Sequence, residues 1–183
     1  MPKVTDAHKA ARRDQILAGA RACFDRHGFQ ATTVRDLEAA TGLSSGAIFS
    51  YFGSKLDLFL ALATEDAHRT AELWLQGGLR AVLDGRAQAG SYAASYLEVG
   101  RELLVDETFR QRWEERGETL TAALRGWLLD GQAAGRVRSD LNLEDLLMIC
   151  VVTLDGCALQ LRLGTPADAL RVTVSAFEAT IRG

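Results

Sequence analysis

The chain has 183 residues, of which 48% are hydrophobic and 25% charged, and its formal net charge is −3. This length allows one domain or two small ones with a real core. With only two prolines and no alternation typical of strands, the sequence predicts an all-α fold of about nine helices.

Three cysteines, an odd number, without a leader-like N-terminus argue for a reduced intracellular protein, which we expect in the cytoplasm. The longest apolar run, residues 146–154, is far shorter than the roughly 20 residues that cross a bilayer. We therefore expect no membrane partner.

The charge is unevenly distributed along the chain. Residues 1–55 contain eight Lys or Arg and five acids, whereas residues 56–183 contain thirteen and nineteen. Because surfaces that bind nucleic acid are basic, the N-terminal segment is the candidate polyanion surface in spite of the negative total.

The N-terminal third reads as four helices. Apolar residues recur at helical spacing from about 7 to 27, and Gly28 stands where a C-terminal cap belongs. A capping box at residues 33–36 begins a short helix that Gly42 ends, and Ser44 can cap another that reaches about Tyr51. A second capping box at residues 54–57 begins a long helix through about Gln76.

In the remaining two thirds the helix bounds are predicted less precisely, from glycines and capping residues between the helices. We expect them near 80–84, 88–104, 107–116, 118–134, 142–163 and 167–182. The uneven charge and the helix pattern divide the chain into residues 1–55 and 56–183, with the helix 54–76 as the linker between them.

Two short helices joined by a tight turn with a glycine form a helix-turn-helix, whose second helix can enter a major groove. Here that helix is residues 45–51, and small residues at its start would let its backbone approach base edges closely. An ordinary corner between two helices has the same spacing, so spacing alone leaves both interpretations open.

The residue pattern favours the first interpretation. Residues 32–37 (TTVRDL) and 42–55 (GLSSGAIFSYFGSK) resemble the signature of the TetR family of bacterial transcriptional regulators. The resemblance implies that Thr33, Tyr51 and Lys55 hold phosphates and that Arg35 reaches a phosphate or a base. It places four further residues at the major groove, namely Ser44, Ser45, Gly46 and Ser50.

One physical observation bears on Lys55 separately. The helix dipole disfavours a cation in the first turn of a helix by roughly 0.3–1 kcal/mol, which suggests a phosphate partner. Three residues depart from the family pattern: Phe49 stands where tyrosine is usual, Gly53 where proline is common, and Glu38 where a small residue packs. We expect Glu38 to bend outward or to pair with an arginine.

The resemblance implies that residues 1–55 form a DNA-binding domain and residues 56–183 a ligand-binding and dimerisation domain. The C-terminal half resembles the family only in general architecture, with a weaker likeness in residues 153–161. Because residues 146–161 are apolar almost all round, we expect a second subunit to cover them, together with a last helix that carries Leu170, Val174, Phe177 and Ile181 on one face. A purely internal core is the alternative. A homodimer through the last two helices would read a roughly palindromic operator on double-stranded DNA.

The resemblance further implies a repressor that a small, largely apolar effector releases from its operator. Aromatic and soft side chains could line the effector site, although core packing explains any one of them as well. These candidates are Trp74, Tyr92, Tyr96, Phe109, Trp113, Trp127 and Met148.

Two other classes of function remain to be weighed. Glu65-Asp66-Ala67-His68 resembles half of a di-iron carboxylate site in a helical bundle, but the second Glu-x-x-His is absent. We expect no enzyme, no metal and no cofactor. A helical homodimer that binds a ligand or a protein and has lost DNA binding is the third reading.

Overall fold

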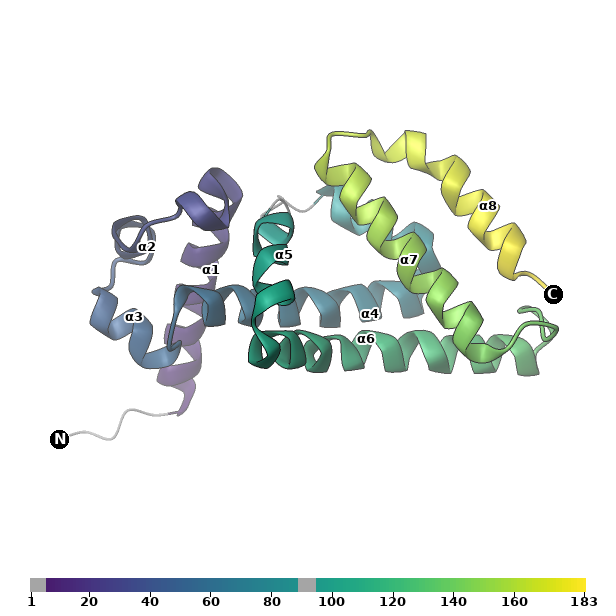
Figure 1. Ribbon diagram of the computed structural model, residues 1–183, viewed down its shortest axis with the longest axis horizontal. Coiled ribbons are helices and arrows are strands. Elements are labelled where there is room, and N and C mark those ends of the chain that lie inside the picture. Colours follow the sequence, from purple (N-terminus) through teal and green to yellow (C-terminus); the bar gives the residue numbers. More distant parts are fainter. Residues whose placement is uncertain (1–5, 89–94) are drawn as a thin grey trace. The chain divides into compact units, whose positions relative to one another are not determined.

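A computed structural model describes residues 6–88 and 95–183 (Figure 1). Within these ranges the chain is helical with no strand, which confirms the predicted all-α fold, and Val137 and Arg182 form an isolated antiparallel bridge. The elements are α1 (Asp6–Ala31), α2 (Val34–Thr41), α3 (Ser45–Tyr51), α4 (Lys55–Gln88), α5 (Ser95–Val105), α6 (Glu107–Ala133), α7 (Leu143–Arg162), η2 (Ala167–Leu170, a 3₁₀ helix) and α8 (Arg171–Ile181).

Glycines interrupt two of the helices where the sequence predicted a stop. Gly28 has φ 80° and ψ 171° inside α1. Gly77 and Gly78 break α4, which then continues to Gln88 and takes in the predicted helix 80–84. The prediction of a break at Gly117 was wrong, because α6 runs unbroken from Glu107 to Ala133. A helix-interior glycine costs only about 1 kcal/mol relative to alanine, so packing along a long helix can outweigh it.

The chain forms two compact units, each with its own core. The first is made of residues 1–65 and 91–116, and the second of residues 66–90 and 117–183. This division differs from the functional boundary expected at residue 55, because α5 and the first part of α6 pack in the same unit as the helix-turn-helix.

The core of the first unit fixes α1, α2 and α3 against one another. Ile16 of α1, Leu37 of α2 and Ile48 of α3 are each fully buried. Phe24, Phe29 and Phe59 pack ring against ring with centroids 5.5–6.2 Å apart. Such aromatic pairs contribute about 0.5–1.5 kcal/mol of stability beyond their burial, so this cluster stabilises the packing of α1 against α4 beside the helix-turn-helix.

The core of the second unit is built around Trp74, which is fully buried and meets Trp127 and Phe177 edge to face at 5.6 and 5.9 Å. Helices α7 and α8 lie side by side in this unit (Figure 1). Their apolar residues, and Leu170 at the end of η2, all belong to this core: Leu146, Leu154, Leu170, Val174, Phe177 and Ile181.

This burial changes the expected dimer surface. The face of α8 that carries Val174 and Phe177 packs in the core of its own unit. For these residues the structure agrees with the alternative of a purely internal core. A partner subunit would therefore contact other side chains of α7 and α8.

The cysteine thiols of the chain are buried as well. Burial raises the pKa of Cys150 to about 12, so this cysteine stays protonated at neutral pH.

No single helix in the described ranges is both long enough and apolar enough to cross a membrane. The bent pair formed by α3 and the adjoining part of α4 passes the same test by length and composition.

Candidate nucleic-acid interface

The predicted capping box at the start of α2 is confirmed. The Thr33 hydroxyl oxygen accepts a hydrogen bond from the Asp36 amide at 3.3 Å, and the Asp36 carboxylate accepts from the Thr33 amide at 2.8 Å and from its hydroxyl at 2.7 Å. These donors stabilise the charged carboxylate and lower the pKa of Asp36 below its usual value.

The turn between α2 and α3 is held from both sides. Gly42 ends α2 in the left-handed region at φ 69° and donates its amide to the Glu38 carbonyl at 2.8 Å. The buried Thr41 donates its hydroxyl to the Leu37 carbonyl at 2.7 Å, and its own carbonyl accepts from Gln15 of α1 at 2.7 Å. These bonds fix the angle at which the two helices meet.

Helix α3 begins with two side-chain acceptors. Ser44 caps it by accepting from the Ala47 amide at 3.4 Å. Glu38 Oε1 accepts from the Ser45 amide at 2.6 Å, so the expectation that Glu38 bends outward or pairs with an arginine was wrong. Glu38, which departs from the family pattern, thus stabilises the start of α3. Its carboxylate accepts from an amide of the first turn, for which the helix itself supplies no carbonyl.

The outer surface of α3 is open and small. Ile48 anchors the helix in the core, whereas Ser44, Gly46 and Ser50 are exposed and Tyr51 is 39% exposed. A Cβ atom added at Gly46 would meet nothing within 4 Å. Thr33 and Arg35 at the start of α2 are exposed as well. All eight predicted DNA-binding residues are therefore at least partly accessible, Ser45 and Lys55 the least so.

Lys55 is half-buried, and its ammonium binds backbone carbonyls of the protein itself. Its ammonium donates to the carbonyls of Phe29 at 2.8 Å, Gln30 at 3.3 Å and Thr32 at 2.9 Å. Burial lowers the pKa of Lys55, and the Glu98 carboxylate raises it. Three donors on three carbonyls explain why a cation stands in the first turn of α4, so a phosphate contact by Lys55 depends on the resemblance alone.

Sequence reasoning missed Glu98 of α5. Its Oε2 accepts from the Gln30 amide at 2.6 Å, and a Cβ atom added at Gly28 would lie 2.4 Å from its Oε1. The positive φ of Gly28 favours glycine, and any side chain there would also displace this carboxylate. No local pattern could have paired residues so far apart in the sequence.

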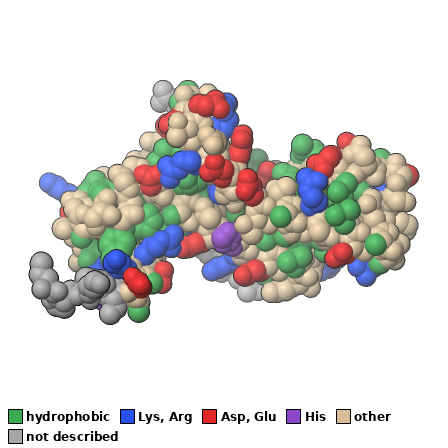
Figure 2. Space-filling view, turned by 90° about the horizontal axis from the view of Figure 1, so that it is seen from below, with side chains coloured by type: hydrophobic (Ala, Val, Ile, Leu, Met, Phe, Trp, Pro, Cys, Tyr) green, Lys and Arg blue, Asp and Glu red, His purple; other side chains and the backbone are tan. Residues whose placement is uncertain are grey.

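Several of the cations in residues 1–55 are used for structure. Arg13 and Arg21 of α1 both pair with Glu65 of α4, at 3.3 and 3.6 Å. Glu65 thus pairs with two arginines of α1. Figure 2 shows one face of the molecule, on which basic and acidic side chains are interspersed. The exposed cations of the described helix-turn-helix include Lys9, Arg26 and Arg35.

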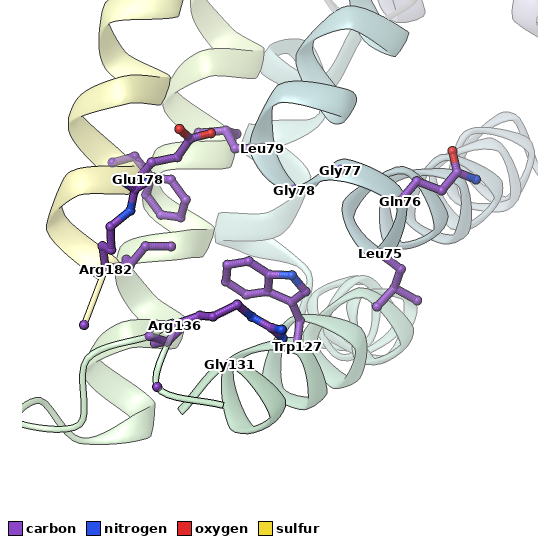
Figure 3. A pocket seen from close by; sticks show the side chains of 15 residues that line it. Leu75, Gln76, Gly77, Gly78, Leu79, Trp127, Gly131, Arg136, Glu178 and Arg182 are labelled. Atoms are coloured by element: carbon purple, nitrogen blue, oxygen red, sulfur yellow. The ribbon is translucent and has the colours of Figure 1, made fainter. Parts of the chain in front are cut away.

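The second unit contains a cavity of about 550 Å³. It lies where α4 breaks at Gly77 and Gly78, beside the ends of α6 and α8 (Figure 3). The bridge between Val137 and Arg182 joins the chain after α6 to the end of α8 beside it. Trp127, Leu75 and Phe177 supply apolar wall, and three charged residues also line the cavity: Arg136, Glu178 and Arg182.

The predicted effector residues do not gather at this cavity. Trp127 lines it, and Trp74 packs against Trp127 from within the core. Phe109 and Trp113 lie in the core of the first unit beside Phe59. Met148 is 62% exposed on α7 and is not a lining residue.

Tyr92 lies outside the described residues, as does the side chain of Tyr96. The charged residues that line the cavity were not predicted from the sequence. The local signal for this site was the glycines at 77, 78 and 135, which lie at the break in α4 and in the turn after α6.

An exposed short helix with small side chains, set on a fixed turn after a second short helix, defines a helix-turn-helix DNA-binding protein. The sequence model described as "Bacterial regulatory proteins, tetR family" matches residues 16–62. The chain is 39% identical over 173 residues to the HTH-type transcriptional repressor AcnR of Corynebacterium glutamicum, covering 93% of this chain and 92% of the relative. It is 40% identical over 185 residues to the HTH-type transcriptional repressor Rv1474c of Mycobacterium tuberculosis, covering 100% and 99%.

Solved structures agree on the fold. A TetR-family transcriptional regulator from Rhodococcus sp. superposes with a TM-score of 0.78 at 16% identity, over 95% of this chain and 100% of that one. FadR from Bacillus subtilis, solved in complex with stearoyl-CoA, superposes with a TM-score of 0.69 at 18% identity, over 90% and 96%. The chain belongs to the TetR family of bacterial DNA-binding transcriptional regulators.

Proposed function

We propose that this protein is a transcriptional repressor that acts in the cytoplasm, binds a roughly palindromic operator as a homodimer, and leaves it when a small effector binds. The observation that carries the proposal is the open surface of α3, whose Ser44, Gly46 and Ser50 are exposed on a turn fixed by hydrogen bonds. The names of the two relatives, both HTH-type transcriptional repressors, support the direction of the effect.

At the operator, the hydroxyl and guanidinium groups at the helix ends bind phosphates while α3 reads the bases. Tyr51 supplies a neutral donor to a phosphate and Arg35 a charged one. The Thr33 hydroxyl, which donates to Asp36 in the free protein, would turn its single donor to a phosphate on binding. Ser44, Ser45, Gly46 and Ser50 face the base edges, where a small surface allows close approach. Lys55 contributes to operator binding mainly by fixing the end of α1, because Thr33 and Arg35 come directly after this segment in the chain.

The exposed apolar side chains of α7 and α8 support dimerisation through these helices. Met148 and Val152 of α7 are 62% and 61% exposed, and Val172 of α8 is 77% exposed. Met148 and Val152 lie one turn apart on the same side of α7. A second copy of this surface would cover them around a twofold axis and hold two α3 helices for half-sites about one DNA turn apart.

The cavity of the second unit is the proposed effector site. Its volume of about 550 Å³ is within the usual range for small-molecule pockets, roughly 300–1,000 Å³. Its wall is mixed, so the effector has an apolar part for Trp127 and polar atoms for Arg136 and Glu178. The buried Trp74 Nε1 has no hydrogen-bond partner within the described residues, and Trp74 packs directly behind Trp127.

Two linked experiments test this function. Wild-type protein first selects duplexes from a random DNA pool, and we expect enrichment of a sequence with two related half-sites. A metabolite library is then screened for compounds that release the selected duplex and quench tryptophan fluorescence. Compounds that release it from wild type but not from Arg136→Ala support the effector site; failure to enrich any sequence would contradict the repressor function.

A further inference from the structure

Glu38 connects the end of α2 to the beginning of α3 through two different groups. Its backbone carbonyl accepts from the Gly42 amide at 2.8 Å, which closes α2, and its carboxylate accepts from the Ser45 amide at 2.6 Å, which opens α3. One residue therefore spans the whole turn of the helix-turn-helix.

The second of these bonds is the stronger constraint on α3. A carboxylate that accepts from a backbone amide forms a charge-assisted bond, about twice as strong as a neutral one, and its charge favours the N-terminal end of a helix. The other side-chain cap of α3, from Ser44 Oγ to the Ala47 amide, is much longer at 3.4 Å. The half-buried position of Glu38 also shields its bond from water.

The length of α3 makes its position sensitive to this bond. The helix has seven residues, about two turns, and one side must stay in the core through Ile48. A helix this short has little stability of its own and takes its orientation from its contacts. A shift of its first turn therefore moves Ser45 and Gly46, which stand at the proposed base-reading end.

We infer that Glu38 is a positioning residue for operator discrimination: its carboxylate sets where α3 begins and so aligns α3 with the bases without itself reading them. This inference rests on the proposed function and adds the residue that controls its specificity. It requires an acceptor atom at the place of Oε1, and a glutamine amide oxygen supplies such an acceptor.

The test compares wild type with Glu38→Ala, Glu38→Gln and a charge-matched control, Glu72→Ala, which removes an exposed carboxylate of α4 in the second unit. The probes are the duplex that wild type enriches from a random pool and a scrambled duplex of equal composition. The readout is the ratio of the two dissociation constants, measured at a temperature at which circular dichroism shows every variant to be folded.

We expect the ratio to fall about tenfold in Glu38→Ala, to fall by a smaller factor of about threefold in Glu38→Gln, which keeps an acceptor but loses the charge, and to stay within about twofold of wild type in Glu72→Ala. Affinity for scrambled DNA stays close to that of wild type, because no phosphate-binding group is lost. An unchanged ratio in Glu38→Ala, equal losses in Glu38→Ala and Glu38→Gln, or parallel losses for both duplexes would overturn the positioning role. If wild type enriches no sequence, both the inference and the proposed function fail.

Discussion

The ammonium of Lys55 donates a hydrogen bond to the carbonyl oxygen of Phe29 at 2.8 Å and lies 4.7 Å from the centroid of the Phe29 ring. The first residue of α4 is thereby tied to the end of α1. Two more carbonyls, of Gln30 and Thr32, share the same ammonium. A lysine that the family pattern assigns to phosphate thus has a clear structural function in the free protein.

We predict that Lys55→Met lowers the free energy of unfolding by about 1.5–3 kcal/mol, because the α1 carbonyls lose a charged donor while the apolar stem over Phe29 is kept. Urea unfolding followed by circular dichroism measures the change. Lys9→Met, at an exposed position of α1, is the matched control and should unfold like wild type. Equal stability of Lys55→Met and wild type would contradict this structural function and leave DNA binding as the role of Lys55.

The capping box predicts a dependence of stability on pH. The pKa of Asp36 lies below its ordinary value of 3.8 because Thr33 donates to the carboxylate. A lowered pKa of an acid contributes stability that is present above the ordinary pKa and is lost as the pH falls through the lowered one.

Asp36→Asn should therefore be less stable than wild type at pH 7, and the difference should shrink below about pH 4 as the wild-type carboxylate becomes protonated. Urea unfolding at a series of pH values measures it. A difference that stays constant from pH 7 to pH 2 would show that the charge of Asp36 plays no part in the capping box.

The proposed dimer surface can be tested without disturbing the core. Val152→Glu places a charge at a position that is already 61% exposed, so the fold of the subunit should be unaffected. We expect this variant to sediment as a monomer at concentrations at which wild type is a dimer, because the charge would be buried in the interface. Leu104→Glu, at an 82% exposed position of α5, is the control and should remain dimeric. Dimeric Val152→Glu would exclude this part of α7 from the interface.

Local signals in the sequence predicted the DNA-binding half well, because its helices are bounded by short-range chemistry. The capping box at Thr33 and Asp36 and the left-handed Gly42 are encoded within four residues of where they act. Gly28 was likewise predicted as a stop, and it interrupts α1 there.

Features that depend on distant contacts could not be predicted in this way. The bond between Gln30 and Glu98 joins residues 68 positions apart, and only the fold brings them together. The stop expected at Gly117 failed because α6 is packed on both sides of it, by Phe109 in one core and by Leu124 and Leu128 in the other. This packing outweighs the cost of about 1 kcal/mol of a glycine inside a helix. The cavity was missed because its charged lining residues, such as Arg136 and Glu178, come from the ends of different helices.

The central claim is that the exposed surface of α3 enters the DNA, and Gly46 tests it most directly. A side chain at Gly46 has open space and a carboxylate near a helix N-terminus is favoured, so Gly46→Glu should fold at least as stably as wild type. In the major groove, however, the same side chain would bring bulk and negative charge against bases and phosphates.

The measurement is the affinity of Gly46→Glu for the duplex that wild type selects, beside Gly126→Glu, another exposed helical glycine with open space around it. We predict that Gly46→Glu loses at least about a hundredfold in affinity, roughly 2.7 kcal/mol, while its melting temperature is unchanged or raised and Gly126→Glu binds like wild type. Binding of Gly46→Glu with wild-type affinity would contradict the claim that α3 is the recognition helix.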